Sequence, residues 1–185
     1  MSPILGVWAS AQQAAFDVGD YESIATITVG SGGAANVTFS SIPSTYQHLQ
    51  IRGVMRSTSS SQDFLYLRVN SDTGSNYSAH RIGGDGSTAT AAGFAGQIWC
   101  WFGFAAGTSN TNIVGATVLD ILDYANTNKN KTMRGIYGSD YNGSGQIYGP
   151  FSNGWYNTSA INSITILGSS NIAEYSSFAL YGIKG

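Results

Sequence analysis

Apolar and polar residues alternate with a period of two along most of the chain, and this spacing predicts β-strands. Residues 46–57 (YQHLQIRGVMRS) show it best, because Leu49, Ile51 and Met55 fall on one face and polar side chains occupy the other. Residues 63–71 (DFLYLRVNS) repeat the pattern. Each of these segments is expected to form a strand with one buried face.

Ten segments in all show strand signals, and short runs of Gly, Ser, Asn and Asp separate them. The ten are residues 23–29, 35–42, 46–57, 63–71, 97–104, 112–124, 131–140, 145–151, 160–170 and 174–185. The first two flank the glycine-rich residues 30–33 and are expected to form a hairpin. No helical period continues beyond the first 20 residues. The pattern therefore predicts an all-β, antiparallel two-sheet β-sandwich, jelly-roll-like, over residues 21–185.

Residues 1–20 differ from the rest of the chain, because apolar side chains flank an Ala- and Gln-rich stretch. These side chains are Ile4, Leu5, Val7, Trp8 and Phe16. The segment either completes the core as a strand or serves as a short N-terminal docking arm that binds another protein. It lacks the basic start of a signal peptide and is too short to cross a bilayer, so no membrane insertion is expected.

Charged residues make up 10% of the chain, against about 25% in ordinary soluble domains. The net charge of −2 leaves no cluster of Lys and Arg for a nucleic-acid partner. A surface with so few charges must either stay soluble through hydration of its neutral polar groups or be partly covered by neighbouring molecules. Composition thus favours an assembly protein over a nucleic-acid-binding one.

Asp120 and Asp123 are the two acidic residues whose spacing most suggests catalysis or calcium binding. In a strand over residues 112–124 they would point to opposite faces, so they cannot form a catalytic dyad. Both faces of this strand are otherwise apolar, as in a central strand covered on both sides or one that presses on a neighbouring subunit. We interpret the aspartates as structural.

The remaining chemistry is sparse. His48, His80 and Cys100 are too few for a zinc site, and no serine lies in a nucleophile elbow. Asp72 and Asp85 lie in Gly- and Ser-rich segments without a complete calcium-loop pattern, so they are expected to start Asx turns. We therefore expect no catalytic residue, no metal site and no cofactor.

Aromatic residues are the remaining candidates for a binding role. Residues 151–159 (FSNGWYNTS) are expected to place Trp155 and Tyr156 in a polar turn, where their rings can stack on a sugar. Asn153 and Tyr148 would supply further contacts to a glycan. The same rings also suit a large all-β core or a subunit interface, and that alternative stays open.

Four stretches of the chain resemble small virion proteins of tailed bacteriophages. They are residues 21–57 (YESIATITVGSGGAANVTFSSIPSTYQHLQIRGVMRS), 70–87 (NSDTGSNYSAHRIGGDGS), 122–132 (LDYANTNKNKT) and 176–185 (SSFALYGIKG). The resemblance covers roughly residues 20–185 and lies in overall texture, not in a catalytic motif. It transfers no functional residues.

The resemblance implies a non-enzymatic β-sandwich subunit, made in the host cytoplasm and exposed on the virion surface, often as a homotrimer. The leading expectation is a capsid decoration (cement or knob) protein whose N-terminal arm docks on the major capsid protein. The alternative is a tail-fibre or receptor-binding tip that is held by a tail protein and contacts host surface glycan.

Overall fold

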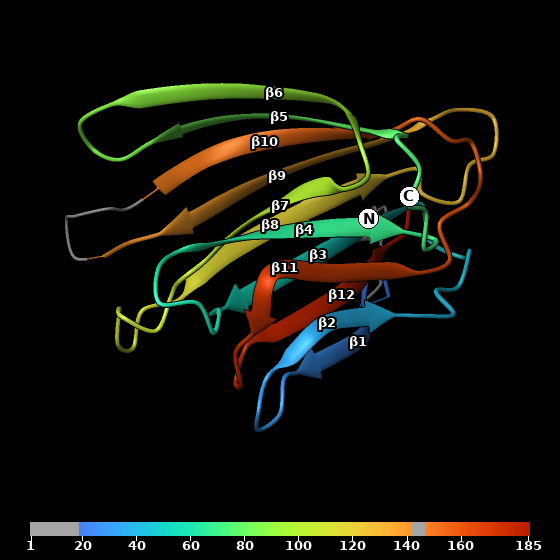
Figure 1. Cartoon of the computed structure of the whole chain (residues 1–185). Coiled ribbons are helices and arrows are strands. Elements are labelled where there is room, and N and C mark those ends of the chain that lie inside the picture. Colours follow the sequence, from blue (N-terminus) through green and yellow to red (C-terminus); the bar gives the residue numbers. More distant parts are fainter. Residues whose placement is uncertain (1–18, 142–146) are drawn as a thin grey trace, which may run out of the picture.

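The computed structural model describes residues 19–141 and 147–185, and within these ranges its regular elements are all β-strands (Figure 1). The twelve strands are β1 (Tyr21–Thr28), β2 (Ala34–Phe39), β3 (His48–Met55), β4 (Asp63–Val69), β5 (Tyr77–Gly84), β6 (Ala89–Gln97), β7 (Cys100–Ala105), β8 (Gly115–Leu122), β9 (Lys131–Ser139), β10 (Ile147–Trp155), β11 (Ile164–Ile172) and β12 (Ser177–Ile183). The predicted sandwich domain, residues 21–185, thus begins with β1. The arm residues Ile4, Leu5, Val7, Trp8 and Phe16 lie outside the described residues.

The strands form two antiparallel sheets that pack face to face, which confirms the predicted β-sandwich. The larger sheet has eight strands in the order β1-β12-β3-β8-β9-β10-β5-β6, and the smaller has four in the order β2-β11-β4-β7. Figure 1 shows the smaller sheet lying against only part of the larger one. The smaller sheet still covers β10 and β5 through β7, where Asn153 bonds to Trp101, and the larger sheet extends beyond it at β6, whose residues are mostly exposed.

Strand pairing is nested along the chain: β1 pairs with β12, β2 with β11, β3 with β8, and β4 with β7. This order is typical of a jelly roll. Two further hairpins, β5–β6 and β9–β10, are inserted into the nested set. Both join the same sheet, and this is why one sheet is twice as wide as the other.

The alternation of apolar and polar residues in β3 and β4 gives each strand one buried face, as predicted. Leu49, Ile51 and Met55 of β3 are fully buried between the sheets, as are Leu65 and Leu67 of β4. Burying such side chains stabilises each by about 1.5–3 kcal/mol relative to exposure. The period-two pattern therefore identified the core face of both strands.

Strand β7 is an edge strand of the smaller sheet, yet all six of its residues are buried. Phe102 packs on Phe178 of β12, with ring centroids 6.1 Å apart, while Phe104 packs on Tyr137 of β9 at 5.2 Å. Side chains of the wide sheet thus pack on this edge strand and contribute to its burial. Cys100 is buried within this strand.

The predicted hairpin at residues 30–33 is wrong. The turn itself is present, with the Gly33 amide donating to the Gly30 carbonyl, but β1 and β2 enter different sheets. Each strand instead pairs with one from the end of the chain. A glycine-rich turn can join two strands of one hairpin or two strands that lie in different sheets. Only the pairing of each strand with distant parts of the chain decides between these connections.

Strands β5 and β6 were not predicted as strands. Strand β6 is rich in Ala and Gly, and Thr90 and Phe94 are its only residues of the β-branched and aromatic kinds that identify strands. The turn that joins the two strands contains Asp85, which the sequence predicted to start an Asx turn. Asp85 begins it by accepting hydrogen bonds from the backbone amides of Ser87 and Thr88.

Candidate functional site

The face of the eight-stranded sheet that points away from the four-stranded sheet, here called the outer face, is the candidate functional surface. Strand register places its residues in rows across β3, β8, β9 and β10. The first row is Val54, Ala116, Gly138 and Tyr148; the second is Arg52, Val118, Ile136 and Pro150; the third is Gln50, Asp120, Arg134 and Ser152. The first two rows are mostly apolar and the third is polar.

Several large apolar side chains on the outer face remain exposed to solvent. Val54 is 48% exposed, Ile136 41%, Ile82 of the neighbouring β5 59% and Tyr148 61%. A continuous group of this kind on one sheet face marks an interaction surface more often than scattered single residues do. The first two rows therefore form an apolar patch.

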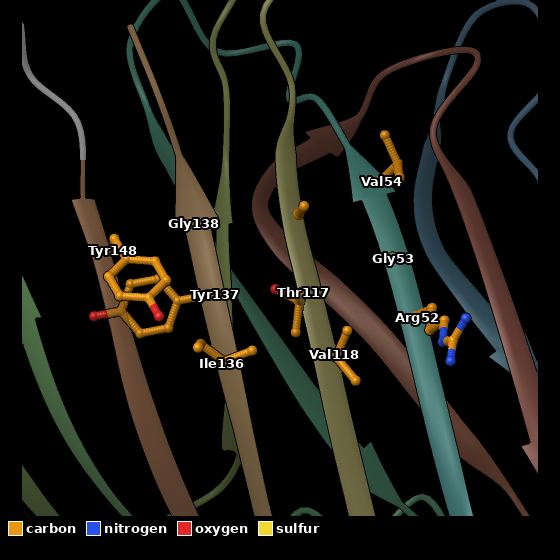
Figure 2. A pocket seen from close by; sticks show the side chains of 10 residues that line it. Arg52, Gly53, Val54, Thr117, Val118, Ile136, Tyr137, Gly138 and Tyr148 are labelled. Carbon is orange, nitrogen blue, oxygen red and sulfur yellow. The ribbon is translucent and has the colours of Figure 1, made fainter. Parts of the chain in front are cut away.

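A groove of about 410 Å³ runs through this patch between β3 and β10 (Figure 2). Small residues, Ala116 and Gly138, form its floor, while Val54 and Tyr148 stand at its sides. A Cβ atom on Gly138 would lie 3.4 Å from Cδ2 of Tyr148. The tyrosine ring therefore leans over the glycine and not away from the sheet.

The polar row borders the groove and satisfies its own hydrogen bonds. Gln50 Nε2 donates to Asp120 Oδ1 at 2.8 Å, and Arg52 Nε and the Tyr21 hydroxyl donate to Gln50 Oε1 at 2.9 and 2.6 Å. Arg134 Nε lies 3.7 Å from Asp120 Oδ2. The row holds charges of both signs next to one another.

Chemically, this surface suits the side chains of another protein. Among the described residues, Arg52 is the only charged one that lines the groove, so few polar groups could orient a sugar or a polar substrate. Apolar contact with a polar border is the usual composition of a protein interface. The signal for it in the sequence was the apolar character of both faces of residues 112–124.

The interpretation of Asp120 and Asp123 as structural agrees with their contacts, but the predicted geometry is wrong. Asp123 has a φ of 46°, so it has left the strand and alternation no longer places its side chain. Its carboxylate pairs with Lys129 and lies 3.5 Å from His48 Nδ1, and this pairing with Lys129 lowers the pKa of Asp123. Asp120 instead contacts Gln50 and Arg134.

The four predicted glycan-contacting residues do not form one site. Trp155 is the last residue of β10 and only 1% exposed, and Asn153 is 3% exposed, so the prediction of a polar turn there is wrong. Asn153 is instead bonded to the backbone of Trp101 through both ends of its amide. Tyr148 and Tyr156 are each 61% exposed, but they are eight positions apart along an extended segment, which places them about 26 Å from each other.

The two expected Asx turns are confirmed. Asp72 Oδ1 accepts a hydrogen bond from the Gly74 amide at 2.8 Å, and Asp85 Oδ1 accepts one from Ser87 at 2.9 Å. In the parts of the chain that the structure describes, no three His, Cys, Asp or Glu side chains are grouped so that they could hold a metal ion.

Residues 19–141 and 147–185 contain no helix of the length and apolarity needed to cross a membrane. Comparison of the chain with protein-family models, with curated proteins and with solved structures finds no match.

Proposed function

We propose that this chain is a non-enzymatic structural protein of a bacteriophage virion, namely a capsid decoration protein on the particle surface. The observation that supports it best is the apolar patch on the outer face, which a wide sheet leaves uncovered. A surface of this kind gains free energy when another protein covers it. The resemblance of the chain to phage virion proteins supplies the setting.

The groove in this patch supports an assembly role over an enzymatic one. Among the described residues, its lining contains a single charged side chain, Arg52, and no pair of groups placed for acid–base or nucleophilic chemistry. A structural subunit of an assembly needs apolar area for contact with other subunits and no reactive groups, and the outer face has this character.

In this proposal the N-terminal arm provides the contact with the major capsid protein. Its apolar residues are Ile4, Leu5, Val7, Trp8 and Phe16. The arm joins the domain at the edge of the eight-stranded sheet, where the Asp20 carbonyl accepts a hydrogen bond from the Lys184 amide. An arm attached at an edge can reach a neighbouring molecule without disturbing the sandwich.

Electron cryo-microscopy of the virion that contains this chain tests the proposal. Density of the size of the sandwich at symmetry axes of the capsid is the expected result. Density restricted to the tail, or none on the particle, would overturn it. Deleting residues 2–18 should abolish binding to capsids while the domain stays folded; a control that replaces only Gln12 and Gln13 with Ser should still bind.

The alternative function is a tail-fibre or receptor-binding tip that contacts host surface glycan. The observation in its favour is the exposure of the Tyr148 and Tyr156 rings, because an exposed ring can stack on a sugar. Trp155 and Asn153 contribute nothing to it, since both are buried.

A further inference from the structure

We propose that two copies of this chain pack outer face to outer face about a twofold axis that runs parallel to the strands, between β8 and β9. This inference goes beyond the proposed function, and it does not depend on a virion. It names one occupant for the apolar patch, a second copy of the same chain.

The row pattern of the outer face carries the proposal. A twofold axis between β8 and β9 places β8 over the partner's β9 and β3 over the partner's β10, and it keeps each row opposite the same row. Val118 then faces the partner's Ile136, and Val54 faces the partner's Tyr148. Apolar residues meet apolar residues at each of these positions.

The third row adds charge complementarity. Under the same axis Asp120 faces the partner's Arg134, and the contact occurs twice because the interface is isologous. Arg134 is available for it, since its side chain is 69% exposed and its ion pair with Asp120 of its own chain is 3.7 Å long. A shift of the partner by one row would instead place this charged row against apolar residues.

The groove accommodates the largest side chain of the patch. Ala116 and the partner's Gly138 face each other and would leave a gap between the sheets. The Tyr148 ring leans over Gly138 and fills this space from both sides of the interface. Figure 2 shows the Tyr148 side chain at the β10 side of the groove. The protruding Tyr148 ring and the groove over Ala116 and Gly138 therefore fit the same features of a second copy.

The area of the outer face is sufficient. Eight strands about 4.8 Å apart and about 20 Å long give roughly 700 Å² for each copy. A stable interface buries about 600–1,000 Å² for each partner, and this range includes the area of the outer face. Two twisted sheets also pack with their strands within about 30° of parallel, which a twofold axis along the strands allows. The small net charge of −2 adds little repulsion between copies.

Charge reversal tests the contact between Asp120 and the partner's Arg134. Asp120→Arg and Arg134→Asp each place like charges together, so each variant alone should dissociate at least about tenfold more readily than the unaltered chain. An equimolar mixture of the two should regain the dimer. In the mixed dimer the arginine introduced in one chain faces the aspartate introduced in the other, and the second contact joins the two unaltered side chains. Damage within one chain could not be repaired by mixing.

The measurement is molar mass by light scattering after size exclusion, over a range of concentrations, with the full chain. Glu174→Arg makes the same charge change at an exposed position off the outer face and should leave the dimer unchanged. A monomeric or trimeric unaltered chain, or a mixture that stays dissociated, would overturn the proposal. Because no virion is used, failure here is separate from failure of the decoration role.

Discussion

Trp155 and Asp72 are joined by a hydrogen bond of 2.7 Å from the indole Nε1 to a carboxylate oxygen, although 83 residues separate them. The same carboxyl group accepts hydrogen bonds from Asn76 Nδ2 at 2.9 Å and from the Gly74 amide at 2.8 Å. One aspartate therefore holds its own turn and satisfies the only polar atom of a buried tryptophan side chain.

We expect Asp72→Ala to destabilise the domain by about 2 kcal/mol, because it leaves the Trp155 N–H without its partner in a buried position. Urea unfolding followed by tryptophan fluorescence measures the change. Asp85→Ala is the matched control. Asp85 also holds a turn, but it accepts hydrogen bonds only from the nearby residues Ser87 and Thr88. Equal losses in the two variants would contradict the role given to Trp155.

Stability should also fall in acid through Asp72. Burial alone would raise the pKa of this carboxyl group, but hydrogen bonds from Asn76, Trp155 and Gly74 outweigh it and lower the pKa below its ordinary value of 3.8. The unfolded chain then binds a proton more readily, so this stabilisation is present above pH 3.8 and is lost as the pH falls below it. Unfolding curves between about pH 2 and 6 should show a smaller acid loss for Asp72→Asn than for the unaltered chain.

Lys131 is 1% exposed, and its ammonium group donates to the carbonyl oxygens of Asn126, Lys129 and Thr158 at 2.6, 3.0 and 2.9 Å. Burial lowers the pKa of this amine, and the charge of Lys129 adds to the effect. We expect Lys131→Met to cost about 3 kcal/mol, because three carbonyls lose a charged donor. Thermal unfolding measures this, and Lys129→Met on the exposed side of the same loop should change little.

Gly115 lies where β8 crosses closest to β7. A Cβ atom there would lie 1.8 Å from the Phe104 carbonyl oxygen, so no side chain fits without moving a backbone. We expect Gly115→Ala to destabilise the domain by about 3 kcal/mol or to prevent folding. Gly30→Ala is the control, since nothing lies within 4 Å of its added Cβ. A soluble Gly115→Ala protein with unchanged urea midpoint would refute this account of the strand crossing.

The burial of Trp155 decides which variants can test the glycan alternative. Loss of host adsorption in Trp155→Ala would reflect unfolding, so the informative variants are Tyr148→Ala and Tyr156→Ala. Both residues are exposed, and both variants should remain folded by circular dichroism. If the tip function is right, one of them lowers binding to a glycan array or to host cells at least about tenfold. No glycan bound by the unaltered chain would exclude this alternative.

The candidate surface was only partly readable from the sequence. Apolar residues on both faces of 112–124 indicated that this strand is covered twice or meets a neighbour. Ile136 and Tyr148 gave no such signal, because each belongs to a different strand and is isolated within it. Register across four strands brings them together, and register depends on pairings between distant residues. The burial of Trp155 was missed for the same reason, since Asp72 lies 83 residues away.

The sequence by itself determined the all-β class, the core face of β3 and β4, and the Asx turns at Asp72 and Asp85. These features depend on residues within a few positions of one another: a period of two and a side chain that caps its own turn. Only the tertiary structure decided that β1 and β2 enter different sheets, and that two inserted hairpins widen one sheet beyond the other. Those outcomes depend on which distant backbone edges pair, and the apolar outer face exists because of them.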